Sequence, residues 1–217
     1  PLKNTTMEDT VLLSKKLAIN VGKKLGIPVY CYGYSASSEE RKNLANIRSG
    51  QYENLKKKVK LHKWKPDYGS TEFNSKTGAI AIGARDILVA YNINLNTDSI
   101  IIARNIASDL RRTLNHVKAI GWYIEEFGCT QVSTNITDIE KTPLHKVFEE
   151  VSKIANIKGF KVTGSEIMGL VPVNALKTAG KYYSESKITI LPDIELINTA
   201  IQRLALNDIR DFIPNQR

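Results

Sequence analysis

The order of strands and helices predicted after residue 78 constrains the fold of this chain more than any other feature. Four segments have the apolar runs or alternation typical of β-strands, and two segments carry apolar residues at helical spacing. The tight connection EEFGC, in which Gly128 can adopt a positive φ, joins two of the strands directly. The predicted elements are a strand at 79–95 broken at Gly83-Ala84-Arg85, a helix at 98–114, strands at 117–124 and 130–136, a helix at 142–158 and a strand at 160–167.

This order, β-α-β-β-α-β, predicts a ferredoxin-like arrangement, in which two helices cover one face of an antiparallel sheet. Two further helices are expected around residues 173–186 and 192–206. The fold class is therefore α/β (α+β), with two subdomains, of which the C-terminal one is the ferredoxin-like βαββαβ sheet covered by helices. We place the boundary near Gly78, which gives segments 1–77 and 78–217.

The first segment is expected to begin with a long helix. A capping-box pattern at Thr5-Thr6-Met7-Glu8-Asp9 indicates its start, and Gly26 suits its end. A strand is predicted at 27–32 and a second helical region at 37–60, weakened in its middle by Gly50. The apolar stripe of the first helix is expected at Val11, Leu12, Leu17, Ala18, Val21 and Leu25.

A polar connection, WKPDYGSTEFNSKTG at residues 64–78, joins the two segments. Connections longer than about 12 residues without regular structure are usually functional or disordered. Its aromatic residues argue against disorder, and its two glycines would let backbone N–H groups approach a ligand. We therefore expect a ligand site here, with a solvated surface loop as the alternative. Flat surface would come from Trp64, Tyr68 and Phe73, hydrogen bonds from Ser70, Asn74, Ser75 and Thr77, and attraction for carboxylates from Lys63, Lys65, Lys76 and Arg85.

The net charge of +9 favours anionic partners, although a run such as Lys56-Lys57-Lys58 is more often a solvated helix face. No apolar run reaches the length of about 18 residues that a membrane span needs, so we expect a soluble, cytoplasmic protein with no membrane partner. Cys31 and Cys129 are expected to be reduced core residues.

The usual catalytic and metal-binding motifs do not occur in the sequence. A nucleophile motif, a P-loop, a dinucleotide fingerprint and zinc-ligand spacing are all absent. His62, His116 and His145 are better interpreted as ordinary surface or interface residues than as catalysts. We therefore expect no metal, and the catalytic residue is unknown from these residues alone.

The strand segment QVSTNITD is unusually polar. Gln131, Ser133, Asn135 and Thr137 share one face of the predicted strand. That face could be solvated, or it could line a cleft and make directional hydrogen bonds to a ligand.

Several ordered blocks of the sequence resemble glutamate formimidoyltransferase, also called formiminotransferase, including the transferase half of formiminotransferase-cyclodeaminase. They extend over nearly the whole chain, which makes the resemblance specific. The blocks are IPVYCYG, NLANIRSGQYENL, WKPDYGSTEFNSKTGAIAIGAR, ILVAYNINLNT, VKAIGWYIEEFGCTQVSTNITD, TPLHKVFEEV and VTGSEIMGLVPVNAL.

The resemblance implies that a formimidoyl group moves from N-formimidoyl-L-glutamate to tetrahydrofolate, the co-substrate, in histidine degradation. It also implies folate bound in a positively charged passage between two α/β subdomains, a homodimer, and a fused or separate cyclodeaminase. On this basis 1–77 is a partial N-terminal and 78–217 the C-terminal formiminotransferase subdomain. The family's folate-binding stretch corresponds to Gly69, Ser70, Thr71, Glu72, Phe73, Asn74, Ser75, Lys76, Thr77 and Gly78.

Two departures from the family pattern concern catalysis and length. The family's catalytic histidine lies in a His-Pro-Arg-Met-Gly motif upstream of the segment that matches Pro1, and family members often carry extra residues near Arg111-Arg112. The start at Pro1 rather than Met favours a sequence taken from within a longer protein. The alternative is a shortened relative that lacks its acid/base residue.

Two other functions follow from these observations. A folate-binding relative without catalysis would bind tetrahydrofolate and show no turnover. An RNA-binding protein would use a basic βαββαβ unit, but the RNA-recognition module stacks bases on aromatic residues, and the corresponding strand CTQVSTNITD contains none. We therefore expect no nucleic-acid partner.

Overall fold

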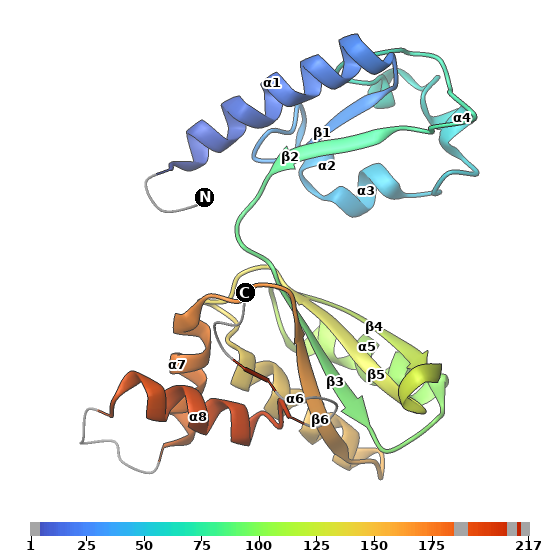
Figure 1. Cartoon of the computed structure of the whole chain (residues 1–217). Helices are drawn as coiled ribbons and strands as arrows, with labels where there is room; N and C mark the ends of the chain where they lie inside the picture. Colours follow the sequence, from blue (N-terminus) through green and yellow to red (C-terminus); the bar gives the residue numbers. More distant parts are fainter. Residues whose placement is uncertain (1–4, 185–190, 208–211, 214–217) are drawn as a thin grey trace. The chain divides into compact units, whose positions relative to one another are not determined.

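The computed structural model describes residues 5–184, 191–207 and 212–213 and divides into two compact units (Figure 1). Unit 1 is Pro1–Asp86 and unit 2 is Ile87–Arg217. The division lies later in the chain than the predicted boundary near Gly78. The reason is that β2 (Ile80–Ala84) pairs in parallel with β1 (Val29–Gly33) and so belongs to the sheet of unit 1. The predicted strand at 79–95 is accordingly two strands in two sheets, β2 and β3 (Val89–Leu95), with the break after Ala84.

In unit 1 the two-stranded sheet is covered on both faces (Figure 1). Alternate residues of β1 face opposite sides, so Val29 and Cys31 join one apolar cluster with Ala18 of α1 (Met7–Leu25), whereas Tyr30 joins a second cluster with Trp64. The second cluster is built by short helical pieces: α2 (Glu39–Lys42), α3 (Leu44–Arg48), α4 (Leu55–Lys58) and the 3-10 helix η1 (His62–Trp64).

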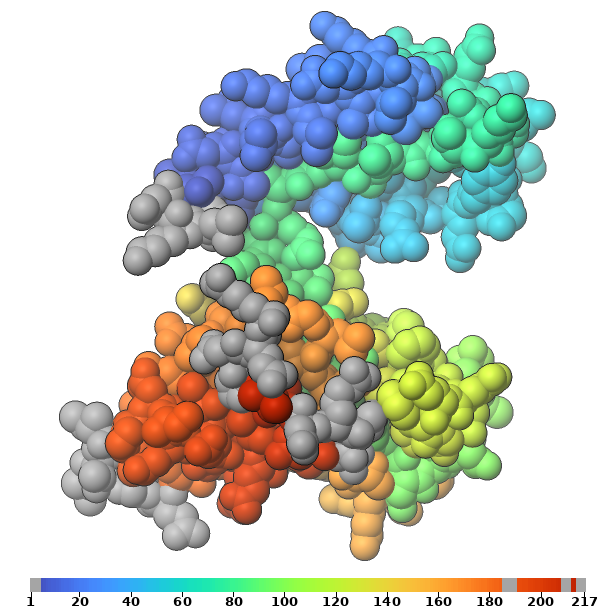
Figure 2. All heavy atoms as spheres, viewed as in Figure 1, coloured from blue at the N-terminus to red at the C-terminus, as the bar shows by residue number. Residues whose placement is uncertain are grey.

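The helix α1 begins with the predicted capping box, formed by Thr6 and Asp9. Its apolar stripe is only partly buried, because the side facing the rest of unit 1 carries the small residues Ser14, Ala18 and Gly22. A Cβ on Gly22 would lie 2.6 Å from the backbone nitrogen of Gly69, so the helix and the loop pack backbone to backbone. Half of the predicted stripe is therefore exposed: Leu12, Leu17 and Leu25 are all more than half exposed. The helix itself forms the blue ridge of unit 1 in Figure 2.

The predicted helical region at 37–60 is wrong as a continuous element. It is interrupted at Gly50 and Gln51, both with positive φ, and its last helix ends at Lys58. The Lys58 side chain is buried, and its ammonium donates to the carbonyl oxygens of Asn46 and Ile47 at 2.7 and 2.6 Å. It also bonds to the carbonyl and hydroxyl of Ser49 and lies 4.1 Å from the centre of the Trp64 ring. A buried cation thus replaces the regular hydrogen bonds that a longer helix would have supplied.

A second buried cation, Arg41, joins the irregular segment to the sheet. Its guanidinium pairs with Asp67 at 2.7 Å and donates to the carbonyl oxygens of Lys63 and Lys65. The other carboxylate oxygen of Asp67 accepts the backbone N–H of Cys31 at 2.7 Å. Breaking such a buried pair on one side leaves an uncompensated charge, so Arg41 and Asp67 fix the course of the chain around β1.

Unit 2 contains the predicted ferredoxin-like sheet, which is confirmed. The strands β3, β4 (Val117–Ile124), β5 (Cys129–Ile136) and β6 (Val162–Met168) are all antiparallel, in the order β4-β5-β3-β6. The 3-10 helix η2 (Glu125–Phe127) and Gly128, with φ of 60°, join β4 to β5. Two helices, α5 (Ile100–Thr113) and α6 (Leu144–Ile157), cover one face of the sheet (Figure 1).

The core of unit 2 lies between this sheet and its helices. Tyr91 and Ile93 of β3, Ile106 and Leu110 of α5 and Val151 of α6 are fully buried. The helix α5 continues unbroken through the two arginines near which family members are expected to carry extra residues.

The glycine of β4 and two more helices complete unit 2. A Cβ on Gly121 would lie 2.2 Å from the backbone of α5, so that helix rests directly on β4. The predicted helices near 173–186 and 192–206 correspond to α7 (Val173–Tyr183) and α8 (Asp193–Arg203), which add to the same core; residues 185 and 186 lie outside the described residues. Among the residues that the structure describes, no helix is long and apolar enough to cross a membrane.

Candidate functional site

The connection at residues 64–78 follows a defined course along unit 1. Gly69 has a φ of 80°, and a Cβ there would lie 1.9 Å from the carbonyl oxygen of Ile27. Near its other end, the side-chain oxygen of Asn74 accepts the N–H groups of Lys76 and Thr77, and the carbonyl of Asn74 accepts the N–H of Gly78 at 2.8 Å. The two glycines therefore serve tight packing and a turn, and the Gly78 N–H is used within the chain rather than offered to a ligand.

The aromatic residues of the connection face the interior rather than solvent. Trp64 is 8% exposed and belongs to the cluster around Tyr30. Tyr68 packs against the opposite cluster, and Phe73 packs beside Tyr52, with 5.5 Å between the ring centres. The expected stacking of a ligand on Trp64 is therefore wrong, because this ring is a core residue.

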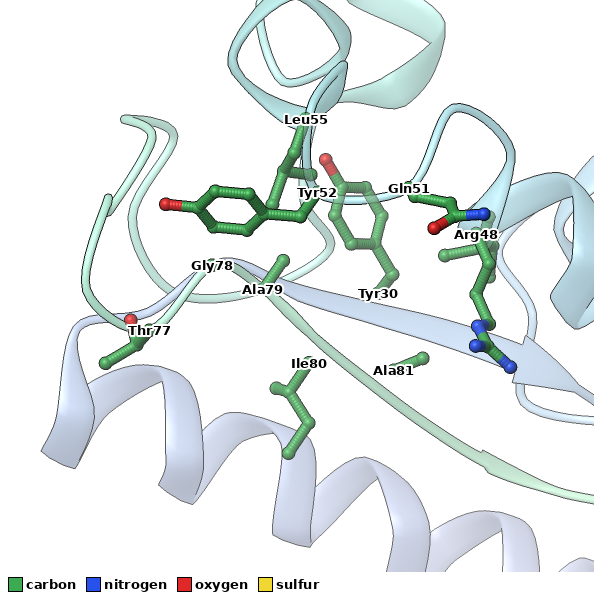
Figure 3. A pocket seen from close by; sticks show the side chains of 11 residues that line it. Tyr30, Arg48, Gln51, Tyr52, Leu55, Thr77, Gly78, Ala79, Ile80 and Ala81 are labelled. Atoms are coloured by element: carbon green, nitrogen blue, oxygen red, sulfur yellow. The ribbon is translucent and has the colours of Figure 1, made fainter. Parts of the chain in front are cut away.

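A hollow of about 430 Å³ lies in unit 1 beside the C-terminal end of the connection (Figure 3). This volume is in the range of small-molecule sites, about 300–1,000 Å³. Figure 3 shows Arg48 and Gln51 at one end and Thr77 at the other, with the rings of Tyr52 and Tyr30 between them. The lining residues are Tyr30, Ile47, Arg48, Gln51, Tyr52, Leu55, Thr77, Gly78, Ala79, Ile80 and Ala81.

The two tyrosines offer ring surface to the hollow, and their hydroxyls are engaged. The Tyr30 hydroxyl donates to the carbonyl of Trp64 at 2.7 Å, and burial raises the pKa of Tyr30 to about 12. The Tyr52 hydroxyl donates to the carbonyl of Ser75. Flat apolar walls with fixed hydroxyls suit a planar ring.

Arg48 supplies the charge of the hollow. It is exposed at the end of α3 and, among the described residues, makes no ion pair. A guanidinium with unused donors suits a carboxylate, which it can bind through two parallel hydrogen bonds. The arrangement therefore suits a ligand that combines a flat ring with an acidic group.

The predicted site residues divide into two groups around this hollow. Thr77 and Gly78 line it, whereas Gly69, Ser70, Thr71, Glu72, Phe73, Asn74, Ser75 and Lys76 do not. The opposite wall, formed by Arg48, Gln51, Tyr52 and Leu55, is not predicted by the sequence patterns. The only signal for that wall was Gly50 inside an expected helix, because a break there is what brings these residues to the loop.

The residues of the polar strand face differ in their surroundings. Gln131 is fully buried on the sheet face opposite α5 and α6 and is hydrogen-bonded within unit 2, whereas Asn135 is exposed. The partners of Gln131 are side chains of other strands of the same sheet, so this part of the face is a polar network within unit 2.

None of the three histidines lies in the hollow. His62 and His116 are exposed. His145, on α6, stacks on Tyr182 with 4.2 Å between the ring centres, and burial lowers its pKa. The part of the chain that the structure describes holds no group of three or more His, Cys, Asp or Glu side chains suited to a metal ion.

Two family models match the chain. The formiminotransferase domain, N-terminal subdomain, matches residues 1–85, and the formiminotransferase domain matches residues 90–217. The two matches meet close to the boundary between the structural units.

The chain is also similar to formimidoyltransferase-cyclodeaminases and glutamate formimidoyltransferases. It is 40% identical over 227 residues to the formimidoyltransferase-cyclodeaminase of Gallus gallus. This alignment covers 100% of the chain and 42% of the relative. It is 44% identical over 188 residues to the glutamate formimidoyltransferase of Thermoplasma acidophilum, covering 84% of this chain and 62% of the relative. The formimidoyltransferase-cyclodeaminase of Dictyostelium discoideum is 38% identical over 228 residues, with 100% of the chain and 42% of the relative covered. The chain thus spans less than two thirds of the length of these relatives.

Proposed function

The chain belongs to the formiminotransferase family, and we propose that it acts in the transfer of a formimidoyl group from N-formimidoyl-L-glutamate to tetrahydrofolate. The products would be 5-formimidoyltetrahydrofolate and L-glutamate. The observation that carries the proposal is that subdomain models of this one family match both structural units, residues 1–85 and 90–217.

The hollow in unit 1 supports tetrahydrofolate as the co-substrate. Its tyrosine rings and apolar floor suit the flat pterin or benzoyl part of the molecule, and Arg48 suits a carboxylate of its glutamate tail. In the proposed complex the stretch Gly69–Gly78 contacts the folate, with Thr77 and Gly78 at the hollow itself. No metal takes part in this proposal.

The chemistry requires a nucleophile and a proton. The N5 amine of tetrahydrofolate attacks the amidine carbon and forms a C–N bond, and N5 gives up its proton. The bond from this carbon to the glutamate nitrogen then breaks, and that nitrogen takes up a proton as it leaves. Holding both reactants in one orientation is itself a large part of catalysis in such a reaction, worth about 7–11 kcal/mol in the best intramolecular cases.

The proton donor for the leaving nitrogen is unknown. A general acid with a pKa near neutral is needed, and histidine suits that role. Tyr30 does not, because its pKa is raised to about 12 and its hydroxyl donates to a backbone carbonyl. The lining of the hollow contains neither a histidine nor a carboxylate.

That lining favours a second candidate function, a folate-binding protein without catalysis. The two functions share the hollow and differ in turnover. A protein that binds tetrahydrofolate saturably and leaves N-formimidoyl-L-glutamate unchanged would be the second candidate.

Other parts of the proposal concern assembly and setting. We propose a homodimer, a cytoplasmic location, a place in histidine degradation, and a cyclodeaminase that is fused or separate. The relatives named formimidoyltransferase-cyclodeaminase support the last point.

The test uses the purified protein with both substrates. We expect tetrahydrofolate-dependent loss of N-formimidoyl-L-glutamate and formation of 5-formimidoyltetrahydrofolate. Mass spectrometry measures both compounds. The variant Arg48→Met should weaken tetrahydrofolate binding by about ten- to hundredfold, since a charge-assisted hydrogen bond contributes roughly 1.5–3 kcal/mol. Lys56→Met, which changes an exposed cation outside the hollow, is the control. Equal affinity in both variants would contradict the placement of folate, and absence of turnover would contradict the transferase.

A further inference from the structure

One wall of the hollow in unit 1 belongs to the irregular segment 47–55, which the buried Lys58 closes into a loop. The side-chain ammonium of Lys58 binds four oxygen atoms at distances between 2.6 and 3.1 Å: the carbonyl oxygens of Asn46, Ile47 and Ser49 and the hydroxyl of Ser49. The backbone N–H of Lys58 donates to the carbonyl of Asn54 at 2.9 Å. One residue therefore holds both ends of this wall.

Arg48, which supplies the charge of the hollow, lies inside this loop. Its two neighbours in the chain, Ile47 and Ser49, both offer their carbonyl oxygens to the ammonium of Lys58. The carbonyl of Arg48 accepts the N–H of Gln51 at 2.9 Å. Gln51 has a φ of 50°, which residues other than glycine rarely adopt, and the turn brings its side chain to the same end of the hollow as Arg48 (Figure 3).

Lys58 does not line the hollow and has no donor to offer a ligand. Its three N–H groups are shared among the four oxygen atoms, and the ring centre of Trp64 lies 4.1 Å from its nitrogen. Within the described part of the chain Lys58 makes no ion pair, although its residue is only 7% exposed. Burying a cation without a carboxylate is unfavourable, so an apolar side chain would be the simpler way to fill this space.

We propose that Lys58 is a positioning residue for ligand binding in the hollow and that it acts through Arg48. The ammonium fixes the carbonyl groups on both sides of Arg48 and thereby the backbone from which the guanidinium projects. Less ordering is then required when an acidic ligand binds, which raises the affinity. The identity of this ligand as tetrahydrofolate rests on the proposed function, whereas the positioning rests on the hydrogen bonds of Lys58.

The experiment measures the affinity of 4-aminobenzoyl-L-glutamate, a probe that combines a flat ring with carboxylates. Lys58→Met keeps the apolar stem and removes the ammonium, and it should weaken probe binding by about tenfold although Arg48 is unchanged. In an Arg48→Met background the same change should have an effect of less than about twofold, because the residue through which Lys58 acts is gone. At saturating probe the NMR signal of the Arg48 Nε–H group should shift in the unchanged protein and shift less in Lys58→Met.

Two control variants separate positioning from a general loss of stability. Lys57→Met removes the exposed neighbouring cation. Ile82→Ala removes an apolar side chain from the cluster on the other face of the unit 1 sheet and lowers stability without changing the loop that Lys58 closes. Both should bind the probe like the unchanged protein at a temperature where circular dichroism shows every variant to be folded. If Lys58 only stabilised unit 1, Lys58→Met would bind the probe as Ile82→Ala does.

The outcomes separate this inference from the proposed function. Additive effects of Lys58→Met and Arg48→Met, equal affinity of Lys58→Met and the unchanged protein, or no binding of the probe at all would overturn the positioning role. If the two changes are coupled and tetrahydrofolate gives no turnover, the transferase proposal fails while the positioning role stands. If turnover occurs and Lys58→Met leaves the KM for tetrahydrofolate unchanged, the positioning role fails while the transferase stands.

Discussion

Unit 1 encloses two cations, Arg41 and Lys58, in its interior, whereas the core of unit 2 is formed by apolar side chains between a sheet and its helices. Each cation is surrounded by backbone carbonyl oxygens from an irregular segment. In unit 2 the backbone groups are paired mainly within long helices and strands. A small sheet with a long irregular cover needs specific polar anchors, and a regular sheet with regular helices needs close apolar packing.

The two units also differ in net charge. Residues 1–86 contain 16 basic and 8 acidic residues, whereas residues 87–217 contain 15 basic and 14 acidic ones. Nearly all of the net charge of +9 therefore comes from unit 1, which also contains the hollow with Arg48. Attraction of an acidic ligand by long-range charge would act mainly on unit 1.

The largest expected effect is that of Arg41→Met. This change leaves the buried carboxylate of Asp67 without its cation, which destabilises a protein by about 3–5 kcal/mol. Hydrogen exchange should show the loss in the amides of β1 and β2 and leave β3 and β5 unchanged. The double variant Arg41→Met/Asp67→Asn should recover part of the stability. Equal losses in both sheets would break the comparison, because the units would then unfold as one.

The matching change in unit 2 is Leu110→Ala. Leu110 is fully buried, and removing such a side chain from a packed core costs about 2–5 kcal/mol, part of it for the cavity that remains. Exchange should now increase in β3 and β5 while β1 is unaffected. On the same helix Ile101 is 65% exposed, and Ile101→Ala should change the free energy of unfolding by about 0.5 kcal/mol or less.

The third change, Lys58→Met, keeps the apolar stem against Trp64 and removes the ammonium. The carbonyl oxygens of Asn46 and Ile47 then lose a buried donor. An unsatisfied buried group lowers the free energy of unfolding by about 1–3 kcal/mol. We expect a lower urea midpoint for unit 1, measured by hydrogen exchange of the amides in β1. Lys57→Met at the exposed neighbouring position should have no such effect, and an equally stable Lys58→Met would show that this cation is dispensable.

The smallest expected effect is a pH dependence confined to unit 2. Burial lowers the pKa of His145 in the folded state, so the unfolded chain binds a proton more readily. Stability from this group is complete above the unfolded pKa of about 6.5 and is lost as the pH falls through the folded value. Urea midpoints at pH 7.5 and 5.5 should differ less for His145→Gln than for the unchanged protein. An identical difference in both proteins would exclude His145 as the cause.

The fold of unit 2 could be predicted from the sequence because its signals are local. The stripes of α5 and α6 and the connection at Gly128 each depend on residues close together in the chain, so periodicity alone reveals them. Unit 1 depends on distant contacts. Lys58 binds carbonyl groups 9 to 12 residues earlier, and Arg41 pairs with Asp67, so neither the break near Gly50 nor the burial of these cations is visible in a helical pattern.

The candidate sites follow the same division. The connection at 64–78 could be identified from its length and glycines, and its C-terminal end lines the hollow. The opposite wall with Arg48 and Tyr52 could not be identified, because it forms only where the expected helix is interrupted. In unit 2 the polarity of QVSTNITD was apparent, but the partners of Gln131 come from three other strands and depend on their register.

The long separation of β1 and β2 in the chain also determines when each unit can assemble. The parallel pair of unit 1 has residues 34–79 between its strands, so the chain must close a large loop before that sheet gains any hydrogen bond. In unit 2, β4 and β5 are neighbours joined by a single short turn and can pair early. Unit 2 is thus expected to fold before unit 1, which leaves residues 34–79 of unit 1 open to proteases for longer.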